Sequence, residues 1–346
     1  MEAVDVRGKF VWHQLMTRDV PGAKKFYSKL AGWKMQPWPP DPNYTVAHSE
    51  VGPTAGIMAI PAEMPGDVPP HWLQYIGTRD VDATAEAAVR AGGSVMKAPT
   101  DMQGAGRYAV IKDPQGAVFA ILDPENARAE PTGAPPLGTF SWHELATSDN
   151  EAAFAFYSQL FGWDAITRMD MGPIGTYLIF GWNGQQRGGM YISPANTPMP
   201  PNWLPYVSIA NADAGFALAK STGAKELMAP MDVPGGSRIA AVLDPAGAAF
   251  AVHSMPVAAA KPAAAQPKAS APKASAPKAA PKPKAKTKAK AKAKAKVKSK
   301  AKAAPKRKAA KKVVAKRKKA VKKAANKPAM KKSKAKSKSK MGRKKK

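Results

Sequence analysis

The 346-residue sequence contains no cysteine, which excludes disulfide bonds, thiolate nucleophiles and zinc sites with cysteine ligands. It has no apolar run near the roughly 20 residues that a membrane-spanning helix needs. The first residues, MEAVDVRGKF, lack the basic start and the apolar segment of a secretory signal. These absences predict a soluble, cytoplasmic protein without a membrane partner.

A further absence divides the chain. Residues 255–346 hold 37 lysines and arginines but no acidic and no aromatic residue, whereas residues 1–254 hold all eight tryptophans and a net charge of −6. Dense charge of one sign with little apolar surface cannot offset the entropy of ordering, so this basic tail is expected to be disordered. The first 254 residues suffice for two domains that each bury a core.

What the sequence does contain is a long internal repeat. Four segments recur in the same order about 130 residues apart, which indicates a duplicated unit. The pairs are FVWHQLMTRD (10–19) with FSWHELATSD (140–149), KKFYSKLAGW (24–33) with FAFYSQLFGW (154–163), PPHWLQYI (69–76) with PPNWLPYV (200–207), and VIKDPQGAVFAI (110–121) with AVLDPAGAAFAV (241–252). We therefore expect a first domain at 8–124, a linker at 125–137, a second domain at 138–254 and the basic tail at 255–346.

Each repeat has the pattern of two βαβββ modules, which makes the expected fold class α+β. In the first repeat, periodicity and turn residues predict strands at 9–17, 33–37, 44–49, 56–60, 72–78, 94–97, 107–112 and 118–122. Helices are expected at 20–30 and 81–91, and in the second repeat at 151–161 and 212–222. Alternation in the first strand places Phe10, Trp12, Gln14 and Met16 on one face.

These features together resemble the vicinal oxygen chelate superfamily, the group of glyoxalases, bleomycin-resistance proteins and extradiol dioxygenases. The resemblance rests on the paired modules, a first strand that ends in Asp before a helix containing FY, a following G-W, and a DPxG turn before the last strand. It covers residues 8–254 and implies eight strands per domain, curled into a partly open barrel around a cleft. Two fused copies imply an intramolecular pseudo-dimer.

The resemblance also implies where a divalent metal would bind. By position, the ligands of the family's metal enzymes fall on three apolar sites in each repeat: Trp12, Leu73 (or the adjacent Trp72) and Ala120 in the first, and Trp142, Leu204 (or the adjacent Trp203) and Ala251 in the second. Indole and aliphatic groups supply no oxygen or nitrogen lone pair for a divalent cation. We therefore expect neither a metal nor another cofactor.

Five polar residues near these positions remain as donors, and two of them, Gln14 and Glu144, face the expected cleft. Glu144 with His253 is the one pair in the second repeat that could recruit a metal or act as a weak catalytic pair, with Glu144 as general base. His13 and His143 are one residue out of phase with the ligand position. We expect them to be buried and hydrogen-bonded to backbone rather than to ligate.

Two arginines and four tryptophans are candidates for binding a small molecule. Arg107 and Arg238 precede the DPxG turns, where they either pair with surface carboxylates or hold an anionic ligand at the cleft rim. The tryptophans could line a flat apolar pocket. The predicted ligand-binding set is Trp12, Gln14, Trp72, Arg107, Trp142, Glu144, Trp203 and Arg238.

The basic tail resembles the C-terminal tails of linker histones and of bacterial histone-like proteins. Its charge predicts non-specific binding to DNA, or secondarily RNA, by counterion release, and hence association with the nucleoid. A purely solubilising tail is the alternative. The predicted contacts are Lys284, Lys286, Lys288, Lys290, Lys292, Lys294, Lys306, Arg307, Lys308, Lys316, Arg317, Lys318 and Lys319.

Three functions follow from these features. The preferred one is a metal-independent protein that binds a small molecule and is tethered to nucleic acid by its tail. The second is a glyoxalase-like lyase or isomerase, or a dioxygenase, that uses a divalent metal. The third is a nucleoid-associated DNA-binding protein in which the two domains serve only as a platform.

Overall fold

The computed structural model describes residues 4–129, 133–172, 175–194 and 199–256. The first repeat contains β1 (Phe10–Thr17), α1 (Val20–Ala31), β2 (Lys34–Trp38), β3 (Asp41–Ser49), β4 (Gly52–Ala59), β5 (His71–Gly77), α2 (Val81–Arg90), β6 (Ser94–Met102), β7 (Gly106–Lys112) and β8 (Val118–Pro124). The second contains β9 (Phe140–Thr147), α3 (Asn150–Phe161), β10 (Asp164–Asp170), β11 (Thr176–Trp182), β12 (Gln185–Ile192), β13 (Asn202–Ser208), α4 (Ala212–Ser221), β14 (Lys225–Asp232), β15 (Arg238–Leu243) and β16 (Ala249–Ser254).

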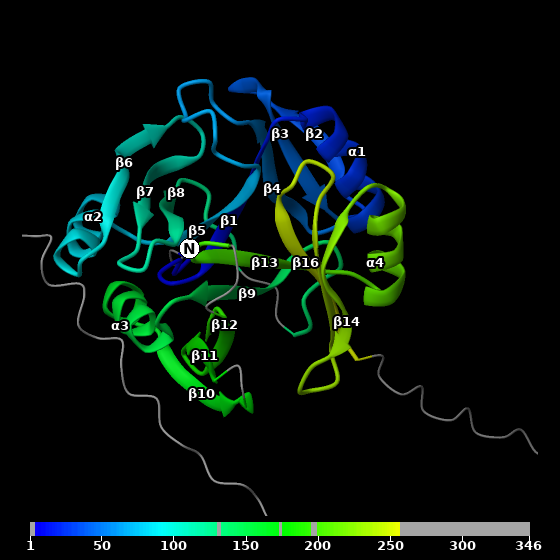
Figure 1. Ribbon diagram of the computed structural model, residues 1–346. Helices are drawn as coiled ribbons and strands as arrows, with labels where there is room; N and C mark the ends of the chain where they lie inside the picture. Colours follow the sequence, from blue (N-terminus) through cyan, green and yellow to red (C-terminus); the bar gives the residue numbers. More distant parts are fainter. Residues whose placement is uncertain (1–3, 130–132, 173–174, 195–198, 257–346) are drawn as a thin grey trace, which may run out of the picture. The chain divides into compact units, whose positions relative to one another are not determined.

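Each repeat folds into one eight-stranded sheet. The strand orders are β2-β3-β4-β1-β5-β8-β7-β6 and β10-β11-β12-β9-β13-β16-β15-β14, so the two repeats have the same topology (Figure 1). In each sheet the first strands of the two modules pair antiparallel at the centre, as β1 does with β5 and β9 with β13. The prediction of paired βαβββ modules and an α+β fold is confirmed.

The helix after each first strand begins and ends where the sequence signals predict. Asp19 caps α1 by accepting a 2.9 Å bond from the backbone N–H of Gly22, and proline follows at the first turn. Gly32 ends the helix in the left-handed conformation, with φ at 71°. Asp149 and Gly162 do the same for α3. None of the four helices in the described part of the chain is long and apolar enough to cross a membrane.

A β-bulge corrects the predicted face pattern of β1. The register with β5 shifts between Phe10 and Trp12, so Val11 is the extra residue. Phe10 consequently does not share a face with Trp12: its ring stacks on that of His143, with centroids 3.6 Å apart, whereas Val11 packs toward the barrel interior. Simple alternation fails there because a bulge inverts the facing of every residue before it.

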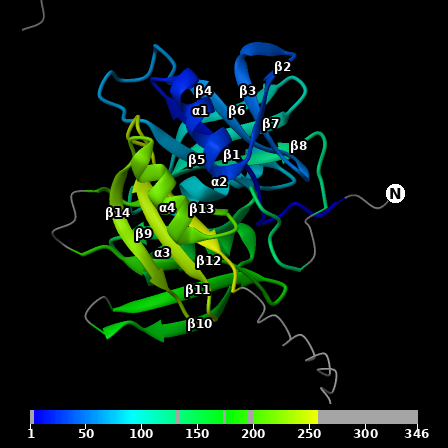
Figure 2. The ribbon, with the colours of Figure 1, turned by 90° about the vertical axis from the view of Figure 1, so that its right-hand side faces the viewer.

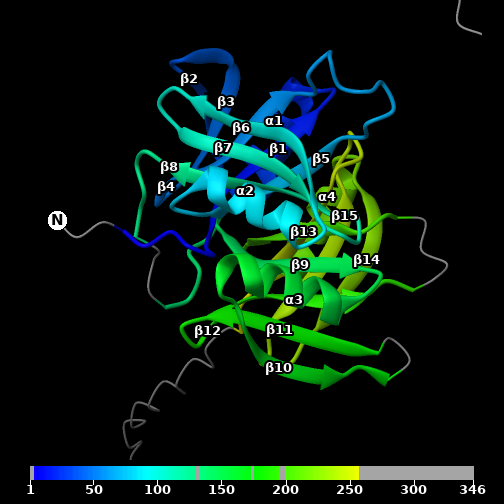
Figure 3. The same ribbon diagram turned by 90° about the vertical axis from the view of Figure 1, so that its left-hand side faces the viewer.

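The two faces of each sheet have different partners. The concave faces enclose small apolar clusters that belong to one repeat each. The opposite faces form two large cores, and both cores are shared: Phe26 and Trp33 of the first repeat pack in one cluster with Phe250 and Val252 of the second. The helices follow this arrangement, since α1 contacts α4 (Figure 2) and α2 contacts α3 (Figure 3).

Polar bonds join the repeats at the recurring motifs. Tyr157, from the FY motif of α3, donates a 3.0 Å bond to Asp113 in the DPxG turn of the other repeat, and Tyr27 bonds Asp244 reciprocally at 3.0 Å. The tryptophan of each G-W motif also donates across the interface between the two repeats, which we call the seam. Trp33 Nε1 donates to the carbonyl of Gly138 at 2.7 Å. The motifs recur because each copy completes the core of the other.

Candidate functional site

Glu144 lies in the interior of the second barrel, at the end of a chain of hydrogen-bond donors. Trp142 Nε1 donates to Tyr177 Oη at 3.0 Å, and Tyr177 Oη donates to Glu144 Oε1 at 2.8 Å. Tyr206 Oη donates to the other carboxylate oxygen, also at 2.8 Å. Residues of three strands, β9, β11 and β13, therefore hold the carboxylate in place, and each of its oxygens accepts a hydrogen bond.

The first barrel contains the same arrangement with an amide in place of the carboxylate. Trp12 Nε1 donates to Tyr44 Oη at 2.8 Å. Tyr44 and Tyr75 both donate to Gln14 Oε1, each at 3.2 Å. The two barrels thus differ at their centre by one functional group, a neutral amide against an acid.

Burial controls the ionisation of these groups. It raises the pKa of Glu144, and the bonds from Tyr177 and Tyr206 offset this only in part. Burial also raises the pKa of Tyr206 and Tyr177 well above the usual value, with a further contribution from the charge of Glu144. The pKa of Tyr191, nearby, rises to about 12 for the same two reasons. All three tyrosines therefore keep their protons near neutral pH.

The raised pKa of Glu144 predicts a pH-dependent gain in stability for Glu144→Gln. The unfolded chain ionises this group at lower pH than the folded protein does, so stability is lost as pH rises above the ordinary glutamate range. Gln14 shows that an amide fits the same network. We expect the melting temperature of the variant to exceed that of the wild type at mildly alkaline pH, by about 2–4 °C for each kcal/mol of destabilisation that the substitution removes. The difference in melting temperature should vanish below the ordinary glutamate pKa. A higher melting temperature of the variant at acidic pH alone would contradict a raised pKa of Glu144.

The residues at the family's metal positions do not fit a divalent cation. Leu73 and Ala120 lie with Trp12 in the interior cluster of the first barrel, and the second barrel groups their counterparts in the same way. The structure thus brings these positions together, but with apolar side chains. Within the described residues, no three His, Cys, Asp or Glu side chains converge. Glu144, the nearest carboxylate, already accepts two hydrogen bonds.

A cavity of about 810 Å³ opens at the first barrel and extends over the seam. Its aromatic walls include Trp12, Trp38, Tyr44 and Tyr75, three of which belong to the network around Gln14. The second repeat contributes residues that include Phe140, His143 and Arg187. Both repeats therefore build this cavity.

The structure corrects the prediction that Trp72 and Trp203 line the ligand pocket. Both lie in the shared cores, only 6 % and 5 % exposed. Trp72 Nε1 donates a 3.0 Å bond to Tyr27, a residue of the seam. The reason is alternation along β5 and β13: Leu73 and Leu204 face the barrel interior, so the preceding tryptophans point the opposite way.

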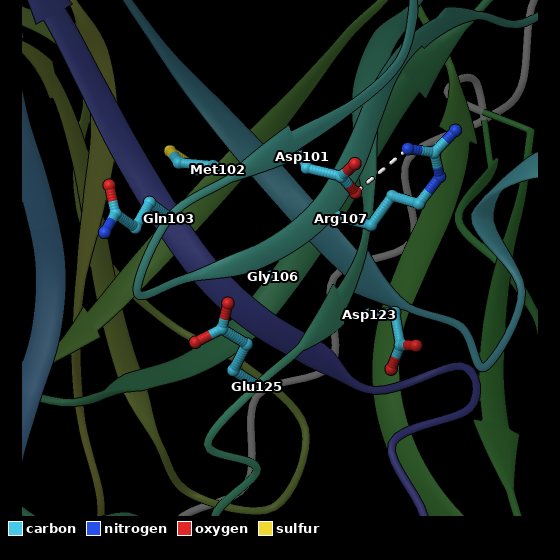
Figure 4. A pocket seen from close by; sticks show the side chains of 7 residues that line it. All are labelled: Asp101, Met102, Gln103, Gly106, Arg107, Asp123 and Glu125. Carbon is cyan, nitrogen blue, oxygen red and sulfur yellow. Dashed lines mark hydrogen bonds and ion pairs between the residues drawn. The ribbon is translucent and has the colours of Figure 1, made fainter.

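Arg107 and Arg238 are paired with surface carboxylates, which is the first of the two alternatives that the sequence leaves open; binding of a ligand by these arginines stays a prediction. The Arg107 guanidinium bonds both oxygens of Asp82, at 2.6 and 2.9 Å, and Asp101 at 2.9 Å; Figure 4 shows the Asp101 contact. Arg238 forms the equivalent bonds in the second repeat. Each arginine thus bonds a helix to the neighbouring β-hairpin, and two carboxylates neutralise its charge.

The two buried histidines bond to each other across the seam. His13 Nε2 and His143 Nε2 are 2.8 Å apart, and His143 Nδ1 lies 3.2 Å from the carbonyl of Arg187. Because His143 Nδ1 must donate to that carbonyl, its Nε2 accepts the proton of His13. Burial lowers the pKa of His143 to about 3, so the pair stays neutral. The expected bond to backbone is found for His143, whereas His13 bonds the partner imidazole.

His253 is not paired with Glu144. Its Nδ1 lies 2.8 Å from Ser141 Oγ, and no hydrogen bond between described residues joins it to the carboxylate. The predicted catalytic pair is therefore separated in the structure, because β16 places His253 beside the bulge residue Ser141 rather than at the centre of the barrel.

Comparison with known proteins identifies the fold. The profile of the Glyoxalase/Bleomycin resistance protein/Dioxygenase superfamily matches residues 9–121 and again residues 139–252. The chain belongs to this superfamily. It is 33% identical over 244 residues to "Putative glyoxylase CFP32" of Mycobacterium tuberculosis (strain CDC 1551 / Oshkosh), covering 70% of this chain and 92% of that protein. It is 31% identical over 260 residues to the anthracycline biosynthesis protein DauV of Streptomyces sp. (strain C5), covering 71% and 92%.

Solved structures support the fold of this superfamily. The Mn(II)-bound glyoxalase of Novosphingobium aromaticivorans superposes with a TM-score of 0.52 at 16% identity, covering 72% of this chain and 83% of that one. The 2,2',3-trihydroxybiphenyl 1,2-dioxygenase of Sphingomonas wittichii strain RW1 gives 0.52 at 12% identity, covering 72% and 90%. At such identities the likeness concerns the fold alone.

Sequence reasoning missed the four tyrosines that surround Gln14 and Glu144. Tyr75 and Tyr206 occupy the same place in the repeated PPxWLxY segment, and Tyr44 and Tyr177 also correspond. A tyrosine kept in both copies beside an inward-facing amide or acid was the available signal. The predicted nucleic-acid contacts between Lys284 and Lys319 lie outside the described residues.

Proposed function

We propose that this chain is a metal-independent small-molecule-binding member of its superfamily, tethered to nucleic acid by the basic tail. One observation carries the first half of the proposal. The six positions that would hold the metal converge inside the barrels, yet all are apolar. A divalent cation needs several oxygen or nitrogen donors in one place, and these barrels offer packing surface instead.

The cavity favours a flat, largely apolar ligand. Its volume of about 810 Å³ is in the range of small-molecule sites, and Trp12, Trp38 and Tyr75 supply aromatic walls against which a ring system can pack. DauV, which is named for anthracycline biosynthesis, supports a polycyclic aromatic ligand.

The basic tail supports the tether to nucleic acid. Its 37 cationic side chains come with no acidic residue, and it lacks the aromatic residues that would read single-stranded bases. Binding is therefore expected to depend on phosphate density rather than on sequence. The tail would hold the ligand-binding body close to the nucleoid.

A thermal-shift screen of residues 1–256 tests the binding half of the proposal. We expect polycyclic aromatic metabolites to raise the melting temperature, and the shift to persist in EDTA. By mass action, a ligand at about 100 times its Kd should stabilise the protein by about 2.7 kcal/mol. Divalent metals that stabilise the protein when added alone, or ligand shifts abolished by EDTA, would contradict it.

The buried acid favours a second candidate, an isomerase or lyase with Glu144 as general base. Burial raises its pKa toward the range that acid–base catalysis requires. Glu144→Gln is the sharp test, because Gln14 shows that the amide preserves the tyrosine network. Turnover of an identified substrate should fall by about 10²-fold or more if Glu144 is the base. Unchanged turnover would remove this candidate.

A further inference from the structure

We infer that His13 determines the ligand specificity of the cavity, and that its Nδ1 accepts a hydrogen bond from a phenolic hydroxyl on a flat aromatic ligand. The inference rests on the proposed binding function and specifies the chemistry of its ligand. Three features carry it: the proton that the two buried histidines share, the place of His13 in the cavity wall, and the uncharged or basic character of the described side chains in that wall.

The histidine pair is asymmetric, although its two members occupy equivalent positions in the two repeats. His13 Nε2 and His143 Nε2 lie 2.8 Å apart, with one proton between them. Because His143 Nδ1 donates to the carbonyl of Arg187, the proton between the rings belongs to His13. A neutral imidazole carries only one N–H. His13 Nδ1 is therefore an acceptor, whereas His143 Nδ1 is a donor.

This acceptor is available at neutral pH and fixed in orientation. Burial, with a smaller contribution from His143, lowers the pKa of His13 well below its ordinary value, so the ring takes up no second proton near neutral pH. The ring stacks on Phe140 with centroids 3.6 Å apart and bonds His143 through Nε2. An acceptor held in this way loses little freedom when a donor binds it.

The cavity gives a ligand access to His13. This residue lines the cavity at the seam, together with the aromatic rings of Phe10 and Phe140. No described residue donates a hydrogen bond to His13 Nδ1. Nor is Nδ1 one of the described side-chain atoms that are both buried and without a partner, so it keeps contact with the open space of the cavity. A ligand that reaches the seam can therefore offer a donor to this nitrogen.

The rest of the wall favours a neutral donor. An ammonium group and a phenolic hydroxyl can both donate to an imidazole nitrogen. The described residues that line the cavity include no aspartate or glutamate, so an ammonium group would be buried without a counter-charge. A phenolic hydroxyl carries no charge and lies in the plane of its ring, which suits a ligand that packs flat against aromatic walls.

A phenol and its methyl ether isolate the contribution of the donor. We choose 9-phenanthrol and 9-methoxyphenanthrene, with phenanthrene as the parent ring, and measure binding to the full chain by equilibrium dialysis at neutral pH. All three probes are uncharged, so the basic tail does not favour one of them. His13→Phe keeps a ring that can stack on Phe140 but removes the acceptor. His48→Phe is the matched control, because His48 also lines the cavity.

We expect the wild type and His48→Phe to bind the phenol about threefold to tenfold more tightly than the ether, as one hydrogen bond allows. His13→Phe should bind the two equally. A preference that persists in His13→Phe or is lost in His48→Phe overturns the inference. Equal binding of all three probes by the wild type also overturns it but leaves the proposed binding function standing, whereas binding of none of them contradicts both.

A second measurement does not depend on how the His13 variant folds. Proton–nitrogen NMR spectra of the full chain with isotopically labelled histidine report which ring nitrogens carry a proton. His13 Nδ1 should be unprotonated in the free protein, and its resonance should shift when the phenol binds but not when the ether binds. A protonated Nδ1, or a resonance that the bound phenol leaves unchanged, contradicts the inference.

Discussion

A fragment of residues 255–346 will bind duplex DNA about as tightly as the whole chain, and a rise in salt from about 50 to about 200 mM will weaken this binding by about 10⁵-fold. This fold-change assumes that about ten of the 37 cations contact phosphates at once, which gives a slope near −9 in log affinity against log salt. Residues 1–254, with a net charge of −6, should not bind detectably at physiological salt.

Gel-shift titrations of the two fragments at both salt concentrations decide the point. Changing the six lysines at alternate positions from 284 to 294 to glutamine supplies the matched control, and the slope should fall by up to about five. Discrimination between DNA sequences should be slight, because lysines that are accompanied by no aromatic residue read charge density and not base edges. Tight, salt-insensitive or sequence-selective binding by residues 1–254 would contradict the tether.

Separating the two repeats will abolish cooperative folding of each. The large cores are shared, so a fragment of residues 1–129 would expose Phe26, Trp33 and other side chains that the second repeat now covers. Each large apolar side chain contributes about 1.5–3 kcal/mol when buried, and whole domains are stable by only about 5–15 kcal/mol. The free energy lost with several such contacts and with the Tyr157–Asp113 hydrogen bond exceeds this free energy of unfolding.

Circular dichroism melting measures this loss directly. The fragments 1–129 and 133–256 should each melt without a cooperative transition, and mixing them should restore a transition close to that of the intact pair. A monomeric 1–129 fragment with a sharp transition of its own would show that the repeats are independent domains and not halves of one pseudo-dimer.

The topology and the helix boundaries could be predicted from the sequence because their signals are local. Asp19, Pro21 and Gly32 act within one helix, and the duplication doubled every such signal. The metal positions could also be judged, because the resemblance to the superfamily assigns them to particular residues and the residue types there are apolar. Val11 shows the limit of this reasoning: a bulge leaves no mark in the apolar pattern, yet it reversed the facing of Phe10.

The polar site could be predicted only in part. Gln14 and Glu144 follow from alternation, but their partners Tyr44 and Tyr177 come from another strand whose register the sequence does not encode. The seam was missed for a related reason. A Tyr157–Asp113 bond joins residues of different repeats, so no periodicity within one repeat reveals it.

Metal content measured on tag-free protein tests the central claim most directly. The account predicts nickel, zinc, iron and manganese far below one atom per chain, because Trp12, Leu73 and Ala120, like their counterparts in the second barrel, offer no ligand. It also predicts that the thermal shifts produced by polycyclic aromatic metabolites are unchanged after dialysis against EDTA. A near-stoichiometric metal that is lost together with ligand binding on dialysis would contradict the account.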